Sequence, residues 1–217
     1  MDTLDILSRF PEYAPVLNLG PNTSVDEFCH LLEQMAERGH IELLEYIGKD
    51  RMNENTRDCI LLHAAKEGHL NIMILAREWG ANAYNDALEY AALNGRIEAM
   101  HLLKKWGTTF YNYALDSAAW AGQTQAMCLL KEWGANCFDW ALKSAAKSGQ
   151  LQAMHSLKEW GASEYDWALV KAAKHGQLQA MHLLKKWGAI DYNTALDYAT
   201  DSGKTEAMHL LEKWGAG

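Results

Sequence analysis

Small apolar residues recur along this chain at a spacing that predicts pairs of short helices. In residues 82–108, one group of such side chains falls on a single face of a helix, and a second group falls on a single face of another helix. The first group is Ala87, Leu88 and Ala91, and the second is Ala99, Met100, Leu103 and Trp106. Gly95 separates the groups and suits a left-handed turn, and Gly107 ends the second helix in the same way. The pattern therefore predicts helix–turn–helix, with helices of about ten residues.

The same pattern returns every 27 residues, so the predicted unit is repeated. Copies of residues 82–108 begin at Thr109, Asn136, Ser163 and Ile190. A tryptophan followed by glycine marks the ends of six units, at Trp79, Trp106, Trp133, Trp160, Trp187 and Trp214. A fixed period of this length is typical of a solenoid, in which each unit packs only against its neighbours. Because helices this short are marginal alone, neighbouring units must stabilise them.

Two repeated residue types have predicted structural roles. Asn or Asp recurs at Asn85, Asn112, Asp139, Asp166 and Asn193, where we expect it to precede the first helix as an N-cap. The tryptophan of each unit shares a helix face with the equivalents of Met100 and Leu103. We therefore expect this tryptophan ladder to lie in the core, and an exposed ligand-binding role is the alternative.

Upstream, the repeat persists in a weaker form and indicates the domain organisation. Residues 1–23 hold all three prolines and are predicted to form a short helix and an irregular cap. Residues 24–217 are predicted to form an all-α solenoid of about seven helix–turn–helix units. The units are expected at 24–52, 53–81, 82–108, 109–135, 136–162, 163–189 and 190–217. Gly39 and Gly68 are 29 residues apart, so two extra residues are expected in the connection between the first two units.

The bulk properties of the 217 residues narrow the function. Hydrophobic residues make up 49% of the chain, which argues against disorder. A net charge of −8 argues against nucleic-acid binding, which needs a basic stripe. Residues 1–80 carry 14 acidic and 7 basic residues. This acidic excess serves solubility, or it forms a patch for a basic partner.

The expected location is the cytoplasm. The start of the sequence lacks the layout of a signal peptide, and no apolar run approaches the length needed to span a membrane. The four cysteines, Cys29, Cys59, Cys128 and Cys137, form no C-x-x-C pair. A reducing compartment without membrane contact fits these features.

Several segments resemble a known repeat family. Gly68–Met73 (Gly-His-Leu-Asn-Ile-Met) and Gly39–Leu44 (Gly-His-Ile-Glu-Leu-Leu) resemble the turn and second helix of the ankyrin repeat. The pattern Ala87-Leu88-x-x-Ala91-Ala92-x-x-Gly95 is similar to the first ankyrin helix, and the Trp-Gly-Ala steps resemble the end of that repeat. The resemblance covers about residues 24–216.

The departures from the family pattern also carry information. The ankyrin repeat has about 33 residues, so this unit is six shorter, and the Thr-Pro that opens the first helix is absent. The missing residues belong to the β-hairpin finger, so these units look like fingerless ankyrin repeats, similar to the short ankyrin-like repeats of large DNA viruses of amoebae. The resemblance implies a protein that binds another protein and is not a catalyst. In a virus, it implies a host factor as partner and the host cell cytoplasm as location.

Variable positions on the first helices form the candidate binding surface, because they fall opposite the Ala-Leu-Ala face. The partner-binding candidates are Tyr113, Trp120, Trp140, Trp167, Lys143, Lys147, Lys171 and Lys174. Exposed aromatic rings beside cations are typical of protein-binding hot spots. The alternative is that the rings fold down over gaps left by the missing fingers.

No pattern indicates a metal site, a cofactor site or an active site. A second ladder, His101, Cys128, His155, His182 and His209, is predicted to face solvent. Its rungs should lie about 10 Å apart, too far to converge on one ion. The chain has no phosphate-binding glycine loop, no H-E-x-x-H and no G-x-S-x-G. We therefore expect no cofactor and no catalysis.

The expected function is a non-catalytic protein–protein interaction scaffold that acts as a monomer. The alternative is a structural or self-associating repeat protein that stacks end to end. The last unit is more polar than the others, as a solvent-facing cap should be, which argues against open-ended stacking. Its polar residues are Thr200, Asp201, Lys204, Thr205 and Glu212. A third hypothesis, a ubiquitin-ligase adaptor as in some viral ankyrin proteins, is disfavoured because we expect no room for their extra C-terminal box.

Overall fold

The structure is a computed structural model that describes Arg9, Pro11 and residues 25–217, with side chains from His30 onward. In this part of the chain the protein forms fourteen α-helices and one 3₁₀ turn, and it contains no strand. The all-α prediction is therefore confirmed. The cap expected over residues 1–23 lies outside the described residues, apart from Arg9 and Pro11.

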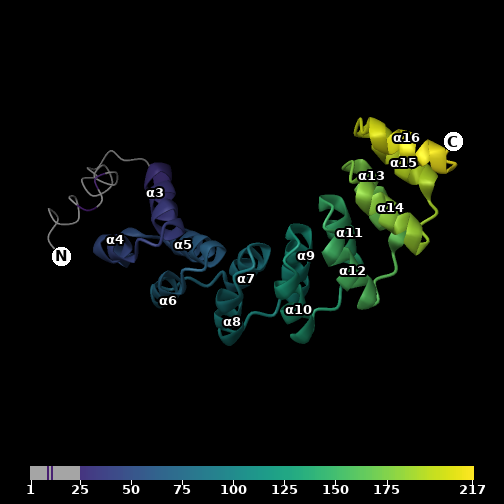
Figure 1. The fold of residues 1–217 in the computed structure, drawn as a ribbon. Coiled ribbons are helices and arrows are strands. Elements are labelled where there is room, and N and C mark those ends of the chain that lie inside the picture. The colour runs from purple at the N-terminus through teal and green to yellow at the C-terminus, as the bar shows by residue number, and fades with distance from the viewer. Residues whose placement is uncertain (1–8, 10, 12–24) are drawn as a thin grey trace. The chain divides into compact units, whose positions relative to one another are not determined.

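The helices come in consecutive pairs, and each pair has a first and a second helix (Figure 1). The first helices are α3 (Val25–Glu37), α5 (Glu54–Glu67), α7 (Tyr84–Leu93), α9 (Tyr111–Ala121), α11 (Phe138–Ser148), α13 (Tyr165–Lys174) and α15 (Tyr192–Asp201). The second helices are α4 (Ile41–Ile47), α6 (Leu70–Glu78), α8 (Ile97–Lys105), α10 (Thr124–Glu132), α12 (Leu151–Glu159), α14 (Leu178–Trp187) and α16 (Thr205–Trp214). The 3₁₀ turn η2 (Lys49–Arg51) lies in the connection where two extra residues were predicted.

The chain divides into two compact units within the α7–α8 pair. The N-terminal unit comprises residues 1–91 and 98–109, and the C-terminal unit comprises residues 92–97 and 110–217. In the N-terminal unit, α3 packs against both α4 and α5, and α5 packs against α6. In the C-terminal unit, α9, α11, α13 and α15 pack side by side in chain order, and each also packs against its own second helix. The first helices of this unit approach one another more closely than the second helices do.

Alanine, leucine and methionine form the core at the predicted repeat positions. Ala118, Ala145 and Ala172 are fully buried on α9, α11 and α13, three first helices that pack side by side. Met127 and Met154 are fully buried on the second helices. The predicted helix faces are therefore confirmed, and each unit is a stack of helix pairs.

The Asn and Asp ladder is not a set of N-caps, which corrects the sequence-based prediction. The first helices α7, α9, α11, α13 and α15 begin at the aromatic residue directly before the Asn or Asp, so Asp139 lies inside α11. Its Oδ1 instead accepts hydrogen bonds from the backbone N–H groups of Ser163 at 2.6 Å and Glu164 at 2.9 Å. The equivalent acceptors are Asp58, Asn85, Asn112, Asp166 and Asn193. Each of these side chains therefore holds the loop 24 residues further along the chain.

The tryptophan ladder is half-buried, so the prediction that it forms core was wrong. Methionine, leucine and alanine already fill the space between the helices, and the tryptophans sit at the ends of the second helices. Trp187 packs on the ring of Tyr165, with centroids 5.6 Å apart, and Lys158 Nζ lies 4.7 Å from its indole. Other cation–ring pairs are Arg77 with Trp106, Lys131 with Trp160, and Lys185 with Trp214.

Glycine at the turn within a pair has a left-handed conformation, and at some of these turns it also lies close to a side chain of the next pair. Gly122 has φ 73°, in the left-handed region predicted for this position. A Cβ atom there would lie 2.5 Å from Oε1 of Gln150, which belongs to the next helix pair. Gly149 meets Gln177 in the same way, also at 2.5 Å. The left-handed conformation recurs at this turn in every described pair, whereas the close approach does not, since a Cβ at Gly203 would meet nothing within 4 Å.

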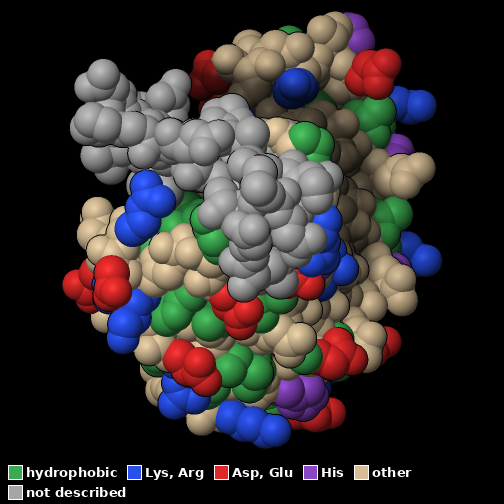
Figure 2. Space-filling model, turned by 90° about the vertical axis from the view of Figure 1, so that its left-hand side faces the viewer, with side chains coloured by type: hydrophobic (Ala, Val, Ile, Leu, Met, Phe, Trp, Pro, Cys, Tyr) green, Lys and Arg blue, Asp and Glu red, His purple; other side chains and the backbone are tan. Residues whose placement is uncertain are grey.

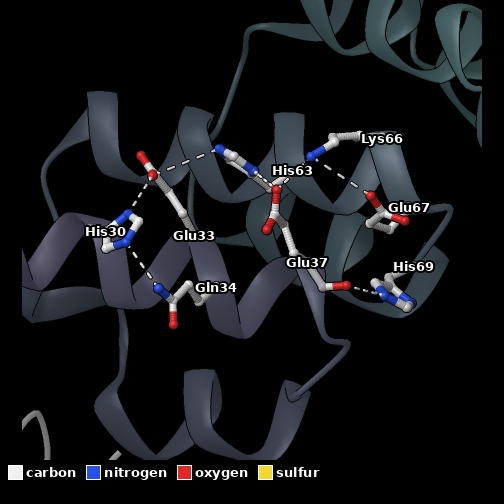
Figure 3. A network of polar contacts seen from close by, with 8 residues as sticks. All are labelled: His30, Glu33, Gln34, Glu37, His63, Lys66, Glu67 and His69. Atoms are coloured by element: carbon white, nitrogen blue, oxygen red, sulfur yellow. Dashed lines mark hydrogen bonds and ion pairs between the residues drawn. The ribbon is translucent and has the colours of Figure 1, made fainter.

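In the N-terminal unit, a polar network joins α3 to α5 (Figure 3). Lys66 Nζ donates a hydrogen bond to Glu37 Oε1 at 2.6 Å, and His63 Nδ1 lies 3.0 Å from the same oxygen. His69 Nε2 lies 2.9 Å from the backbone oxygen of Glu37, at the end of α3. The hydrogen bond from Lys66, followed by that from His63, lowers the pKa of Glu37, and the hydrogen bond to Glu37 raises the pKa of Lys66.

Candidate protein-binding surface

The four predicted aromatic residues lie exposed on three neighbouring first helices of the C-terminal unit. Tyr113 and Trp120 are on α9, Trp140 is on α11 and Trp167 is on α13. The exposed fractions of these side chains are 51% for Tyr113, 46% for Trp120, 42% for Trp140 and 52% for Trp167. About half of each side chain is therefore open to solvent, where a partner could reach it.

Two of these rings support each other. The rings of Tyr113 and Trp140 meet edge to face, with centroids 5.2 Å apart and planes at 77°. Phe110, which directly precedes α9, packs against Tyr113 at 5.6 Å. Edge-to-face contacts of this kind are favourable, so the rings are held on the surface by one another. Phe110 was not among the predicted partner-binding residues, because it lies in a loop and the candidates were chosen by helical spacing.

The four predicted lysines gather around one hollow. It has a volume of about 490 Å³ and lies over α11 and α13. Its lining residues are Trp140, Lys143, Ser144, Lys147, Lys171, Lys174 and His175. Trp120 and Trp167 are exposed but do not line this hollow.

Helical spacing explains why these residues meet. Trp140, Lys143, Ser144 and Lys147 are related as i, i+3, i+4 and i+7 on α11, so they share one face. Lys171, Lys174 and His175 are related as i, i+3 and i+4 at the end of α13, so they also share one face. Ser144 and His175 were not among the predicted site residues. The i, i+4 spacing from Trp140 and Lys171 could have identified them.

Positive charge exceeds negative charge at this hollow. Lys143 Nζ pairs with Glu164 Oε2 at 2.8 Å, and Lys174 Nζ lies 5.6 Å from the ring centroid of Tyr198. Within the described residues, neither Lys147 nor Lys171 has a carboxylate within ion-pair distance. The hollow therefore presents cations that could pair with acidic groups from outside.

On the face shown in Figure 2, the acidic side chains of the described residues do not gather into one patch. Acidic side chains, in red, are interspersed there with basic ones, in blue, and with hydrophobic ones. Glu37 in the N-terminal unit is already paired with Lys66, and Glu33 lies 3.9 Å from His63.

The second ladder faces solvent, as predicted. The side chains of His101, Cys128, His155, His182 and His209 are all exposed. His155 lies against Trp187 and His182 against Trp214, with ring centroids 5.3 Å apart in both pairs. Among the residues that the structure describes, no three His, Cys, Asp or Glu side chains are grouped so that they could hold a metal ion. No described helix is long and apolar enough to cross a membrane.

Comparison with known proteins identifies the fold. Neither a protein-family model nor a curated protein matches the chain. Solved structures do match, among them the crystal structure of the human ASB11 ankyrin repeat domain. The two share 23% sequence identity with a TM-score of 0.59, and the alignment covers 83% of this chain and 96% of that domain. The fold is that of an ankyrin repeat domain.

The helix pairs of this chain have no β-hairpin between them in the described region. Five residues, 106–110, connect α8 to α9, and no strand lies between any two pairs in residues 25–217. Repeat stacks of this kind offer extended surfaces to other proteins.

Proposed function

We propose that this protein is a non-catalytic scaffold that binds a partner protein through the first-helix surface of its C-terminal unit. The surface comprises the aromatic and basic residues Tyr113, Trp120, Trp140, Trp167, Lys143, Lys147, Lys171 and Lys174. The observation that carries the proposal is the contact of Tyr113 with Trp140 at the edge of the lysine-lined hollow. The ankyrin repeat fold supports it, because such folds are typical of protein-binding scaffolds.

Energetic considerations support the same surface. Tryptophan and tyrosine are the residue types that contribute most to protein–protein hot spots. A partner that covers Trp140 would bury apolar area at roughly 25 cal/mol per Å². Rings already held by their neighbours lose little side-chain freedom on binding, so more of this free energy is available to binding.

The partner and its setting are part of the proposal. The 27-residue repeat resembles repeats of large DNA viruses of amoebae, so the proposed partner is a host factor met in the host cell cytoplasm. The proposed scaffold acts as a monomer and needs no cofactor. It binds neither nucleic acid nor a membrane.

Self-association is the alternative, and one observation favours it. Leu196 on α15 and Met208 on α16 are half-buried, whereas the equivalent residues of preceding pairs, such as Leu169 and Met181, are fully buried. Thr200 opposes it, because it places an exposed polar side chain where the preceding pairs have a buried alanine. Sedimentation velocity over a range of concentrations separates the two ideas. A constant monomer excludes stacking, and a mass that rises with concentration favours it.

A matched pair of variants tests the scaffold proposal. Tyr113→Ala/Trp140→Ala/Trp167→Ala removes the aromatic row, and Ile74→Ala/Ile190→Ala removes other exposed apolar side chains, of exposed fraction 42% and 75%. Each is compared with the unchanged protein by quantitative capture from lysate, after circular dichroism confirms folding. A partner lost only from the aromatic variant supports the proposal. A partner retained by that variant, or lost equally from the control, contradicts it.

A further inference from the structure

We propose that the hollow between α11 and α13 binds an acidic segment of the partner protein. A carboxylate of this segment pairs with Lys147 and Lys171, and an apolar side chain of the segment packs on Trp140. This inference rests on the proposed scaffold function and names the chemistry of the partner. It begins from the charges at the hollow. Four lysines line it, and the described part of the chain supplies one carboxylate, Glu164, which pairs with Lys143.

The lysines of the hollow are also close enough together to repel one another. Lys143 and Lys147 are four residues apart on one helix face, a spacing at which like charges are unfavourable. Lys171 and Lys174 are three residues apart on the adjacent helix and are half-buried, so water screens their charges less than it would on an open surface. A carboxylate placed among these ammonium groups would gain attraction and relieve repulsion.

The basic zone is narrow, which favours a short acidic segment over a nucleic acid. At the position equivalent to Lys143, α9 carries Asp116. At the position equivalent to Lys174, α15 carries Asp201. The helices on both sides of α11 and α13 thus replace a lysine with an acid. A nucleic acid needs an extended basic stripe, and the whole chain carries a charge of −8. A few carboxylates in an otherwise uncharged peptide match this zone without meeting the flanking acids.

The aromatic edge adds a second requirement for the partner. Trp140 lines the hollow and is 42% exposed, and its ring meets that of Tyr113 on α9 edge to face. An aliphatic or aromatic side chain next to the acidic group could pack on this indole. The segment we infer therefore alternates acidic and apolar residues, or places one apolar anchor beside a cluster of acids.

Fluorescence anisotropy with a defined probe tests the inference. The probe is a fluorescein-labelled peptide of alternating glutamate and leucine, compared with the same peptide carrying glutamine for glutamate and with a single-stranded deoxythymidine oligonucleotide. Lys147→Glu/Lys171→Glu changes the hollow. Lys186→Glu/Lys213→Glu makes the same change of net charge at exposed lysines of α14 and α16.

We expect the acidic peptide to bind, and the affinity to fall about tenfold or more in Lys147→Glu/Lys171→Glu, with little change in the control. The inference is overturned if both variants lose equal affinity, if the glutamine peptide binds as well, or if the oligonucleotide binds more tightly than the acidic peptide. The same variants applied to the captured partner separate the two proposals. A partner lost from the aromatic variant but kept by Lys147→Glu/Lys171→Glu overturns the acidic segment and leaves the scaffold. A partner kept by both contradicts the scaffold.

Discussion

The carboxylate of Asp139 accepts a hydrogen bond at 2.6 Å from the backbone N–H of Ser163, which lies in the next repeat. The same carboxylate accepts a second bond from the N–H of Glu164. These N–H groups precede α13 and have no partner within that helix. A single side chain therefore holds the start of the next helix pair, and this link recurs along the stack.

Removing this link should destabilise the C-terminal unit. We expect Asp139→Ala to lower the free energy of unfolding by about 1 kcal/mol, because two exposed backbone N–H groups lose their acceptor and bond to water instead. Asp139→Asn keeps an acceptor oxygen, as Asn112 does at the same position, and should stay close to the unchanged protein. Urea unfolding followed by circular dichroism measures both. An equal loss from the two variants would mean that negative charge, and not the hydrogen bond, stabilises this loop.

The Asn and Asp ladder shows where sequence reasoning stops. The recurrence of Asn or Asp among the repeats correctly indicated that Asp139 is constrained, and an N-cap is the usual local use of such a residue near a helix start. The constraint is instead a contact with Ser163, 24 residues away. A periodic sequence makes local and inter-repeat contacts look alike, since a residue and its partner both recur at the same interval.

Gly122 should be more sensitive to substitution than Gly134. Both have positive φ, 73° and 107°, but a Cβ at Gly122 would meet Gln150, whereas one at Gly134 would meet nothing within 4 Å. Gly134→Ala thus reports the backbone strain alone, about 1–2 kcal/mol. Gly122→Ala should lose more free energy of unfolding, and Gln150→Ala in the same chain should recover the excess. Equal losses in the two single variants would show that the side chain of Gln150 moves aside freely.

Lys158 and Trp187 should be energetically coupled. The ammonium lies 4.7 Å from the ring centroid, and the indole is half-buried, so a cation–π contribution of about 0.5–1 kcal/mol is expected. A double-mutant cycle of Lys158→Gln and Trp187→Leu, measured by thermal and urea unfolding, isolates this coupling. The matched control is a second cycle of Lys186→Gln and Trp187→Leu. Lys186 is adjacent to Trp187 in the chain, but adjacent residues of a helix point in different directions. Coupling of the same size in both cycles would contradict the assigned contact.

Sequence reasoning identified the helix pairs more completely than the details of the surface. Ala118 and Met127 were assigned to the core because helical spacing and burial go together. Trp187 was misassigned because spacing does not reveal that smaller side chains already fill the interior. At the candidate site, spacing could place Lys143 and Lys171 on first helices, but the hollow they share depends on how α11 packs against α13. The binding role of these residues and the repeat boundaries stay predictions.

The contact between Glu37 and Lys66 should make the N-terminal unit sensitive to acid. The hydrogen bond from Lys66 holds the pKa of Glu37 below its ordinary value of 4.5, so the stabilisation is complete above pH 4.5 and is lost as pH falls through the lowered pKa. The pKa of Lys66 is raised above 10.5, so the stability that Lys66 contributes to the folded protein is complete below pH 10.5 and is lost as pH rises through the raised value. Glu37→Gln should therefore destabilise the protein at neutral pH, and its difference from the unchanged protein should be smaller at an acidic pH at which Glu37 is protonated. Urea unfolding at the two pH values measures this difference, with Glu78→Gln, an exposed glutamate of α6, as control. A difference that stays constant between the two pH values would show that the charge of Glu37 does not stabilise the packing of α3 against α5.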